Sequence, residues 1–257
     1  MTRTTCDNLT DLPIEKRAMS LDGQRVVIIG GTSGIGLASA TAAACEGAAV
    51  VIVSSNHGRV RDAVDQLPDA TEGQVVDVRS EHAVRELFDR LGAFDHLVYT
   101  AGEPLALEEL QTLSLERARE FFEIRYFGAL AAVKHASSTI RLGGSIVLSS
   151  GSAGARPQKG WTIAASITGA TEALTRALAV EFAPVRVNAV APGVVRTELW
   201  EGIPQAEREA FFNTVGEAML TGRVGEPDEI AQTHLYLMRN RFITGAVIPV
   251  DGGARLV

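Results

Sequence analysis

The sequence predicts a doubly wound α/β fold, in which a parallel sheet is covered by helices on both faces. Short apolar runs rich in β-branched residues alternate along the chain with longer helical patterns, as expected when crossover helices connect parallel strands. Most of these runs are almost continuously apolar, which is typical of strands buried on both faces. No repeat, low-complexity stretch or linker interrupts the pattern. We therefore expect a single domain over residues 21–257, preceded by an N-terminal arm at 1–20.

The elements follow in order along the chain. About seven strands are expected, at 25–29, 49–53, 74–76, 96–99, 145–148, 186–190 and 246–250. The clearest helices are expected at 35–46, 81–91, 115–140 and 163–182. The segment 198–221 follows a strand and carries Leu199, Trp200, Phe211 and Phe212 among charged residues. Because α/β folds bind ligands beyond the carboxyl ends of their strands, we expect this segment to form a substrate lid.

Composition narrows the classes of function. The 257 residues include 24 Lys and Arg against 31 Asp and Glu, for a net charge of −7. This balance does not favour nucleic-acid or anionic-membrane binding, and no apolar run of about 18 residues predicts a membrane span. The five histidines lack metal-ligand spacing, so no metal site is expected. Cys6 and Cys45 form no CxxC pattern, and the N-terminus lacks the apolar stretch of a signal peptide. Reduced thiols and a cytoplasmic location are expected.

A glycine-rich loop follows the first expected strand. Residues 30–36 read Gly-Gly-Thr-Ser-Gly-Ile-Gly, and a helix of small residues comes next. Glycines permit the tight turn and let backbone N–H groups approach a pyrophosphate. A simple strand–helix turn is the alternative, but the position at the start of a βαβ unit predicts a Rossmann-type dinucleotide site. Cofactor contacts are expected from Gly30, Thr32, Ser33, Gly34, Ile35 and Gly36.

The end of the second strand indicates which dinucleotide binds. An acid there would hydrogen-bond the ribose 2′-hydroxyl and repel a 2′-phosphate. The position is instead Ser54, followed by Ser55, Asn56 and Arg59. Serine hydroxyls can donate hydrogen bonds to phosphate, and an arginine can pair with its charge. An ordinary polar loop could share this composition, but the missing acid favours NADP(H) over NAD(H).

The GxxxGxG spacing of the loop resembles that of the short-chain dehydrogenase/reductase family, and the resemblance extends over about residues 21–257. Asp77-Val78 resembles the pair that contacts adenine in that family. Ala101-Gly102 keeps half of an Asn-Asn-Ala-Gly turn, with Tyr99 and Thr100 in place of the asparagines. The run Pro192-Gly193-Val194-Val195-Arg196-Thr197 resembles the segment that holds the nicotinamide carboxamide, and Thr244-Gly245 with Val250-Asp251-Gly252-Gly253 resembles the family's ending.

The resemblance implies further contacts and an assembly. Cofactor contacts are implied at Asp77, Val78, Ala101, Gly102, Pro192, Gly193, Val195 and Thr197. Members of the family commonly form homo-oligomers, so the resemblance implies a homotetramer paired through the helices at 115–140 and 163–182. Both segments are apolar over more than one face, which is more than a helix lying on a sheet needs.

The family's catalytic residues are replaced in this chain. The family uses a Tyr and a Lys one helical turn apart, together with a Ser and an Asn. The corresponding positions hold Ala164, Thr168, Gly151 and Arg125. Ala164 cannot transfer a proton, so the usual mechanism is excluded. Candidate substitute acids, each of which also has a structural interpretation that is favoured for the residue taken alone, are Ser150, Ser152, Lys159, Ser166, Thr168, Tyr99 and Tyr126.

Arg125 is singled out because it lies in an apolar helix, where a charge needs a partner or an anion. We expect it to supply the positive charge that the family places at the lysine. A salt bridge with an acid such as Glu172, or an outward orientation at an interface, are the alternatives.

The sequence therefore predicts an NADP(H)-binding oxidoreductase that acts on a small carbonyl or alcohol substrate through a non-standard proton donor. Candidate catalytic residues are Arg125, Ser150, Ser152 and Thr168. The retained segment at 192–197 favours redox chemistry, because a protein that binds only the adenosine half has little use for it. Two alternatives stay open: a non-redox enzyme such as a lyase, isomerase or cyclase, and a catalytically inactive dinucleotide-binding protein.

Overall fold

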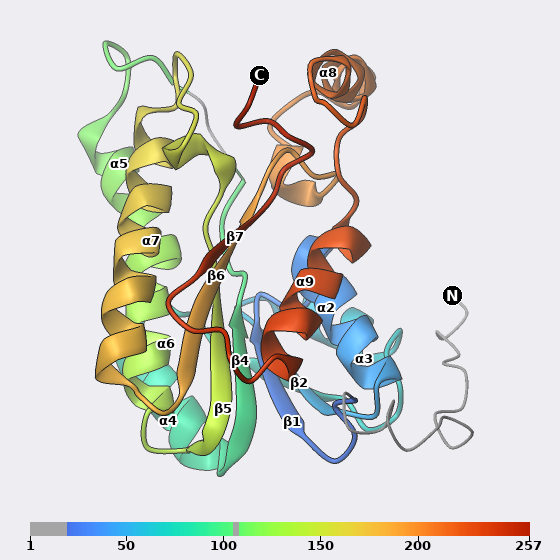
Figure 1. The fold of residues 1–257 in the computed structure, drawn as a ribbon, viewed down its shortest axis with the longest axis vertical. Coiled ribbons are helices and arrows are strands. Elements are labelled where there is room, and N and C mark those ends of the chain that lie inside the picture. The colour runs from blue at the N-terminus through green and yellow to red at the C-terminus, as the bar shows by residue number, and fades with distance from the viewer. Residues whose placement is uncertain (1–19, 105–107) are drawn as a thin grey trace.

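The computed structural model describes residues 20–104 and 108–257. In this part of the chain seven parallel strands form one sheet in the order β3-β2-β1-β4-β5-β6-β7 (Figure 1). The strands are β1 (Arg25–Ile29), β2 (Ala49–Ser54), β3 (Glu72–Val75), β4 (Phe94–Tyr99), β5 (Ile140–Ser149), β6 (Arg186–Pro192) and β7 (Val247–Val250). The expected doubly wound fold is confirmed, with each strand close to its expected place.

Helices cover both faces of the sheet (Figure 1). One layer contains α4 (Glu81–Leu91), α5 (Leu115–Phe122), α6 (Ala129–Ala136) and α7 (Thr162–Glu181), and the other contains α2 (Gly34–Cys45), α3 (His57–Val64) and α9 (Pro227–Arg239). Phe88 and Leu178 pack on the sheet from the first layer, and Ala43 and Ile230 pack on it from the second. α8 (Gln205–Glu217) lies beyond the carboxyl ends of the strands, at the top of Figure 1. The sheet thus separates two apolar cores.

The single helix expected at 115–140 is wrong. α5 passes into a π-helical turn, η2 (Glu123–Gly128), before α6 continues to Ala136, and β5 already begins at Ile140. The wide turn lies against Tyr99, whose phenol donates a hydrogen bond to the Ile124 carbonyl oxygen. A β-carbon on Gly128 would lie 2.5 Å from the same phenol oxygen. Packing against β4 therefore produces a turn that apolar periodicity does not reveal.

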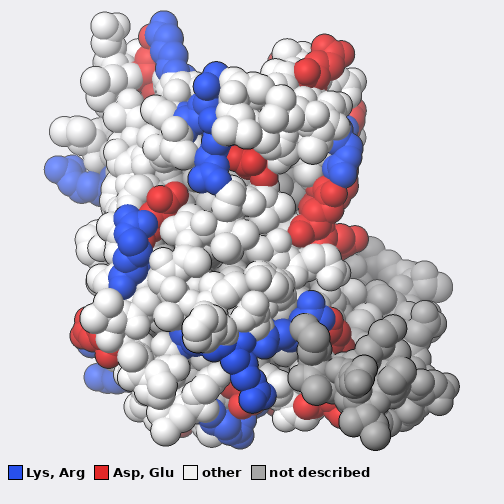
Figure 2. Space-filling view, viewed as in Figure 1, with Lys and Arg blue, Asp and Glu red and all other residues white. Residues whose placement is uncertain are grey.

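The expectation of reduced thiols is also wrong, because Cys45 at the end of α2 is disulfide-bonded. Cys6 and the expected arm at 1–20 lie outside the described residues, except for Ser20. No described helix is both long and apolar enough to cross a membrane. On the face shown in Figure 2, basic side chains are interspersed with acidic ones among large uncharged areas.

Candidate functional site

The glycine-rich loop forms a cradle between β1 and α2. Gly30 has a φ of +89°, and a β-carbon there would lie 2.5 Å from the backbone nitrogen of Ala101. A β-carbon on Gly36 would lie 2.0 Å from the Gly30 carbonyl oxygen. Ser33 precedes α2 in an extended conformation, its side chain does not cap the helix, and the first turn holds no acidic residue. The first-turn amides are therefore open to an anion, and the cradle fits a phosphate group.

A cavity of about 400 Å³ opens from this cradle along the carboxyl ends of the strands. It lies where the strand order reverses between β1 and β4, the position at which doubly wound sheets bind ligands. The candidate cofactor-binding residues other than Asn56, and the four candidate catalytic residues, all line this cavity. Asn56 instead begins α3, where its side chain accepts a hydrogen bond from the Arg59 backbone nitrogen at 3.0 Å. Folding thus brings together candidate residues from eight separate segments of the sequence.

Arg125 projects from the π-helical turn into the wall of this cavity. Its guanidinium lies flat against Gly102, where a β-carbon would approach Cζ to 2.7 Å. It donates a hydrogen bond to the Glu103 carbonyl oxygen, and its Nε lies 3.6 Å from Oε1 of the Glu103 carboxylate. Burial lowers the pKa of Arg125 and raises the pKa of Glu103. The partner of Arg125 is therefore Glu103, and neither Glu172 nor an outward orientation describes its environment.

The wall formed by α7 carries the positions where the family resemblance places the tyrosine and lysine. Ala164 and Thr168 both line the cavity. The Thr168 hydroxyl donates to the Ala164 carbonyl oxygen at 2.9 Å, so its proton is committed to its own helix. Ser150 donates to the Thr168 carbonyl oxygen at 3.2 Å and lies 3.5 Å from a Glu172 carboxylate oxygen. Within the described chain the Ser152 hydroxyl has no hydrogen-bond partner, which leaves it available to a ligand.

Comparison with known proteins identifies the family. A family model described as enoyl-(acyl carrier protein) reductase matches residues 30–255. The short-chain dehydrogenase/reductase ATR9 of Stachybotrys chlorohalonatus is 37% identical over 255 residues, covering 92% of this chain and 99% of that protein. The chain belongs to the short-chain dehydrogenase/reductase family.

Two solved structures of short-chain dehydrogenase/reductases resemble the fold closely. A small-chain dehydrogenase in complex with NADPH is 34% identical, with a TM-score of 0.82. The match covers 92% of this chain and 100% of that chain. The MalC reductase/Diels-Alderase of Malbranchea aurantiaca is 29% identical with a TM-score of 0.86, over 94% of this chain and 99% of that one. The family expectation drawn from the five sequence segments is confirmed.

The other residues considered as substitute proton donors are engaged in contacts with the rest of the protein. Tyr99 lines the cavity, but its buried phenol donates to the Ile124 carbonyl oxygen, and burial raises its pKa. Lys159 is exposed and pairs with Glu109 at 2.7 Å. Ser166 donates to the carbonyl oxygen of Thr162, and the Tyr126 ring packs on Phe122 and Phe127. None of the last three lines the cavity.

The expected lid contains a short 3₁₀ turn, η4 (Glu198–Trp200), and α8. Trp200, Phe212 and Val224 form a small core of their own, apart from the two cores of the sheet. Trp200 lines the cavity and donates through Nε1 to the Val195 carbonyl oxygen at 3.0 Å. Phe211 packs on the Trp200 ring, with centroids 4.9 Å apart, but does not line the cavity. The aromatic residues thus lie beside the site, and movement of the segment stays a prediction.

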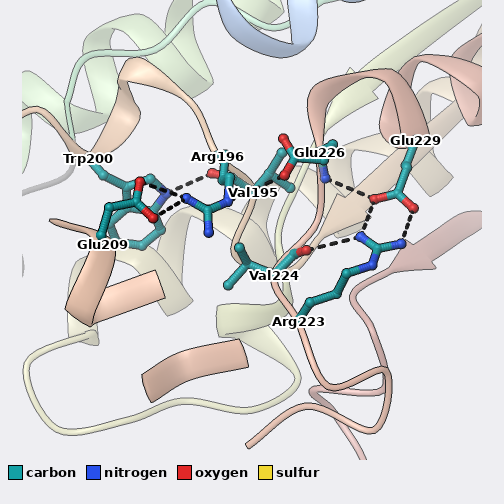
Figure 3. A network of polar contacts seen from close by, with 8 residues as sticks. All are labelled: Val195, Arg196, Trp200, Glu209, Arg223, Val224, Glu226 and Glu229. Atoms are coloured by element: carbon teal, nitrogen blue, oxygen red, sulfur yellow. Dashed lines mark hydrogen bonds and ion pairs between the residues drawn. The ribbon is translucent and has the colours of Figure 1, made fainter. Parts of the chain in front are cut away.

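Ion pairs tie this segment to the 192–197 run (Figure 3). Arg196 pairs with Glu209 of α8 at 2.8 Å and with Glu226 at 3.3 Å. The Arg196 guanidinium also lies 4.6 Å from the centroid of the Phe212 ring. Farther along, Arg223 pairs with Glu229 at 2.6 Å. Arg196, which lies within a family motif, therefore links the 192–197 run to α8.

Sequence reasoning missed several charged residues at the site, and three of them directly follow a predicted motif. Glu103 follows the Ala101-Gly102 turn, and Arg79 follows the Asp77-Val78 pair. Glu198 lines the cavity, and its Oε2 lies 3.2 Å from the place that a β-carbon on Gly34 would take. Each is adjacent to a motif that the sequence did reveal, and that proximity was the available signal.

Proposed function

We propose that this protein is an NADP(H)-dependent oxidoreductase that acts on a small carbonyl or alcohol substrate through a non-standard proton donor. The observation that carries the proposal is one cavity that joins the phosphate cradle, the 192–197 run and the Ala164 wall of α7. The NADPH complex of the relative at 34% identity supports the choice of cofactor.

The residues present fit a dinucleotide. The glycine cradle would hold the pyrophosphate, Asp77 and Val78 the adenine, and Ser54, Ser55 and Arg59 a 2′-phosphate. Ala101 and Gly102 would border the nicotinamide ribose, and Pro192, Gly193, Val195 and Thr197 the carboxamide. Arg59 is exposed and has no acidic partner within the described chain, so its charge is available to a phosphate. When bound, the cofactor supplies the hydride, and the protein must orient it against the substrate.

Four residues would replace the usual catalytic set. Arg125 is permanently charged, so it would stabilise negative charge on the substrate oxygen rather than donate a proton. Ser152, whose hydroxyl is uncommitted, would donate its proton to that oxygen and regain one from a water held by the substrate, which would leave the site as hydroxide. Thr168 can still accept a hydrogen bond from the ribose, and Ser150 would support Thr168 through its carbonyl contact.

A direct test uses NADPH and a panel of small aldehydes and ketones. We expect a decrease in NADPH absorbance with at least one of them. Arg125→Met should lower the rate while NADPH binding, followed by calorimetry, changes little. Parental turnover in Arg125→Met would assign Arg125 a structural role, and inertness toward every carbonyl compound would contradict the redox proposal.

A non-redox reaction, such as a cyclisation, is the second candidate. The relative from Malbranchea aurantiaca is described as a reductase and a Diels-Alderase, and a cycloaddition needs no proton donor, which suits Ala164. Substrate consumption at constant NADPH absorbance would favour this reaction. Bound cofactor without any turnover would instead favour an inactive dinucleotide-binding protein.

We also propose a homotetramer that pairs through α5, α6 and α7. Large apolar side chains on this layer are exposed, including Leu115 at 68%, Phe127 at 50% and Val180 at 81%. Light scattering at micromolar concentration should report a tetramer, and a monomer would contradict the proposal.

The use of NADPH further suggests a location inside the cell, in the cytoplasm, where this cofactor is supplied.

A further inference from the structure

Two arginines line the end of the cavity that is formed by the loops after β2 and β3. They are Arg59 and Arg79. Arg59 has no acidic partner among the described residues, whereas Arg79 is paired with Asp77. Asp77 is also the only acidic residue between positions 54 and 79, all of them described, that lines the cavity. Arg59 therefore offers an unbalanced positive charge to a ligand, whereas the charge of Arg79 is balanced by Asp77.

The contact between Arg79 and Asp77 is a two-pronged fork. Nε of Arg79 lies 3.0 Å from both carboxylate oxygens, and Nη2 lies 2.6 Å from Oδ2. The Arg79 backbone nitrogen adds a third donor to Oδ1 at 3.0 Å. These side-chain hydrogen bonds hold the pKa of Asp77 below its usual value. The Asp77 carboxylate is thus ionised, and the adjacent Arg79 guanidinium balances its negative charge.

Asp77 lies next to the place where a 2′-phosphate would bind. Ser54 at the end of β2 pairs with Val75 of β3, and the Val76 backbone nitrogen donates to the Ser54 carbonyl oxygen at 2.9 Å. Neighbouring strands are about 4.8 Å apart. Asp77, two residues beyond the end of β3, therefore lies about one strand spacing from the end of β2, where Ser54 and Ser55 lie. An uncompensated carboxylate there would repel a phosphate, as an acid at the end of the second strand does. Glu120 also acts electrostatically on Arg79, but it does not line the cavity.

We propose that Arg79 determines specificity for a 2′-phosphorylated dinucleotide by neutralising Asp77. The Asp77 oxygens keep lone pairs for the adenine amino group, while the fork removes the charge that would repel the phosphate. Arg59, which is unpaired, provides the direct cation. This inference rests on the proposed function only in taking NADP(H) as the ligand. Arg79 acts through Asp77 and is a positioning residue.

Calorimetric titration with NADPH and NADH separately tests the role. Arg79→Met should weaken NADPH binding by about tenfold and change NADH binding by less than about twofold. Arg79→Lys, which keeps the charge without the fork, should recover part of the loss. In an Asp77→Asn background, Arg79→Met should cost NADPH nothing further, because no carboxylate remains to be neutralised. Arg61→Met is the matched control, since Arg61 pairs with exposed Asp62 at 2.9 Å and does not line the cavity.

Two results would overturn the inference. Equal weakening of NADPH and NADH by Arg79→Met would make Arg79 a general support of the adenosine pocket. An undiminished NADPH penalty in the Asp77→Asn background would mean that Arg79 contacts the phosphate itself. Failure of the parent protein to bind either dinucleotide would contradict the proposed function instead, so the two failures are distinguishable.

Discussion

Arg125 and Glu103 form an ion pair in the wall of the cavity, with 3.6 Å between Nε and Oε1 and side chains only 22% and 24% exposed. Both carboxylate oxygens of Glu103 are buried without a hydrogen-bond partner. The pair therefore brings a positive charge to the site only together with a negative one. Removing either partner leaves the other charge buried and uncompensated.

Loss of one member of this pair should destabilise the protein. Arg125→Met and Glu103→Gln should each lower the free energy of unfolding by about 1–3 kcal/mol. The double variant should lose less than the sum, because no unpaired charge remains. Urea unfolding of the three variants measures the coupling, and strictly additive losses would show that the two side chains do not interact.

The pH profile of turnover should lack an alkaline decline. A guanidinium stays charged throughout the working range, whereas a catalytic tyrosine loses its proton near pH 10 or below. Installing the family pair through Ala164→Tyr and Thr168→Lys should introduce such a decline, because both positions line the cavity. Ser166→Tyr, on an exposed part of the same helix, is the control. A parental protein with a clear alkaline limb would point to a titrating donor.

Closing the phosphate cradle should abolish dinucleotide binding. The β-carbon introduced by Gly36→Ala would lie 2.0 Å from a backbone oxygen and 2.6 Å from Thr100 Oγ1, so the loop must move. We expect at least about tenfold weaker NADPH binding, since this loop carries the phosphate contacts. Gly169→Ala in α7 meets no atom within 4 Å and should bind like the parent. Unchanged affinity in Gly36→Ala would place the phosphates elsewhere.

Neutralising Glu198 should strengthen dinucleotide binding. Its carboxylate lies beside Gly34 at the start of α2, where the pyrophosphate is proposed to bind. Glu198→Gln should tighten NADPH binding by about two- to tenfold at low salt, with a smaller gain at high salt because ions screen the repulsion. Glu201→Gln, three residues along the same cavity-lining segment, should change affinity less. Weaker binding in Glu198→Gln would indicate that the carboxylate assists the cofactor.

Acid should destabilise the protein through two buried histidines. Burial lowers the pKa of His96 and of His234 from 6.5 to about 4. The unfolded chain therefore binds more protons between these values, so stability is fully present above pH 6.5 and falls as the pH approaches 4. Each histidine contributes a slope of about 1.4 kcal/mol per pH unit. Urea unfolding of His234→Gln should show a shallower slope, and an identical slope would contradict this account.

The sheet and the cradle could be predicted from the sequence because their signals are local. Near-continuous apolar runs define buried strands, and glycines between a strand and a helix define a phosphate loop. The π-helical turn could not be predicted, since Tyr99 and Gly128 meet only after folding. The sequence pattern extends the expected helix to Ile140, which the structure places at the start of β5.

The partners of the polar and charged side chains could not be predicted from the sequence either. The charge of Arg125 in η2 requires a partner, but Glu103 is 22 positions away, in the loop that follows β4. Glu172, which lies one turn beyond Thr168, contacts Ser150 instead. Asn56 looked like a phosphate ligand, yet an asparagine before a helix also serves as a cap, and that local hydrogen bond forms. Residue type gave the chemistry of these positions, and only the fold gave their partners.

The small core of Trp200, Phe212 and Val224 is separate from the cores of the sheet. The end of the cavity beside α8 should therefore open at a lower free-energy cost than the end at the phosphate cradle. The cradle is anchored in the sheet, whose amides should exchange with solvent only on global unfolding. α8 is held mainly by this small core and by the exposed Arg196–Glu209 ion pair, so it can detach by a local fluctuation that costs less free energy. Substrate and product could then enter and leave past α8 while a dinucleotide stays in place. In hydrogen exchange, α8 would form a fast cooperative unit and β1 with α2 a slow one.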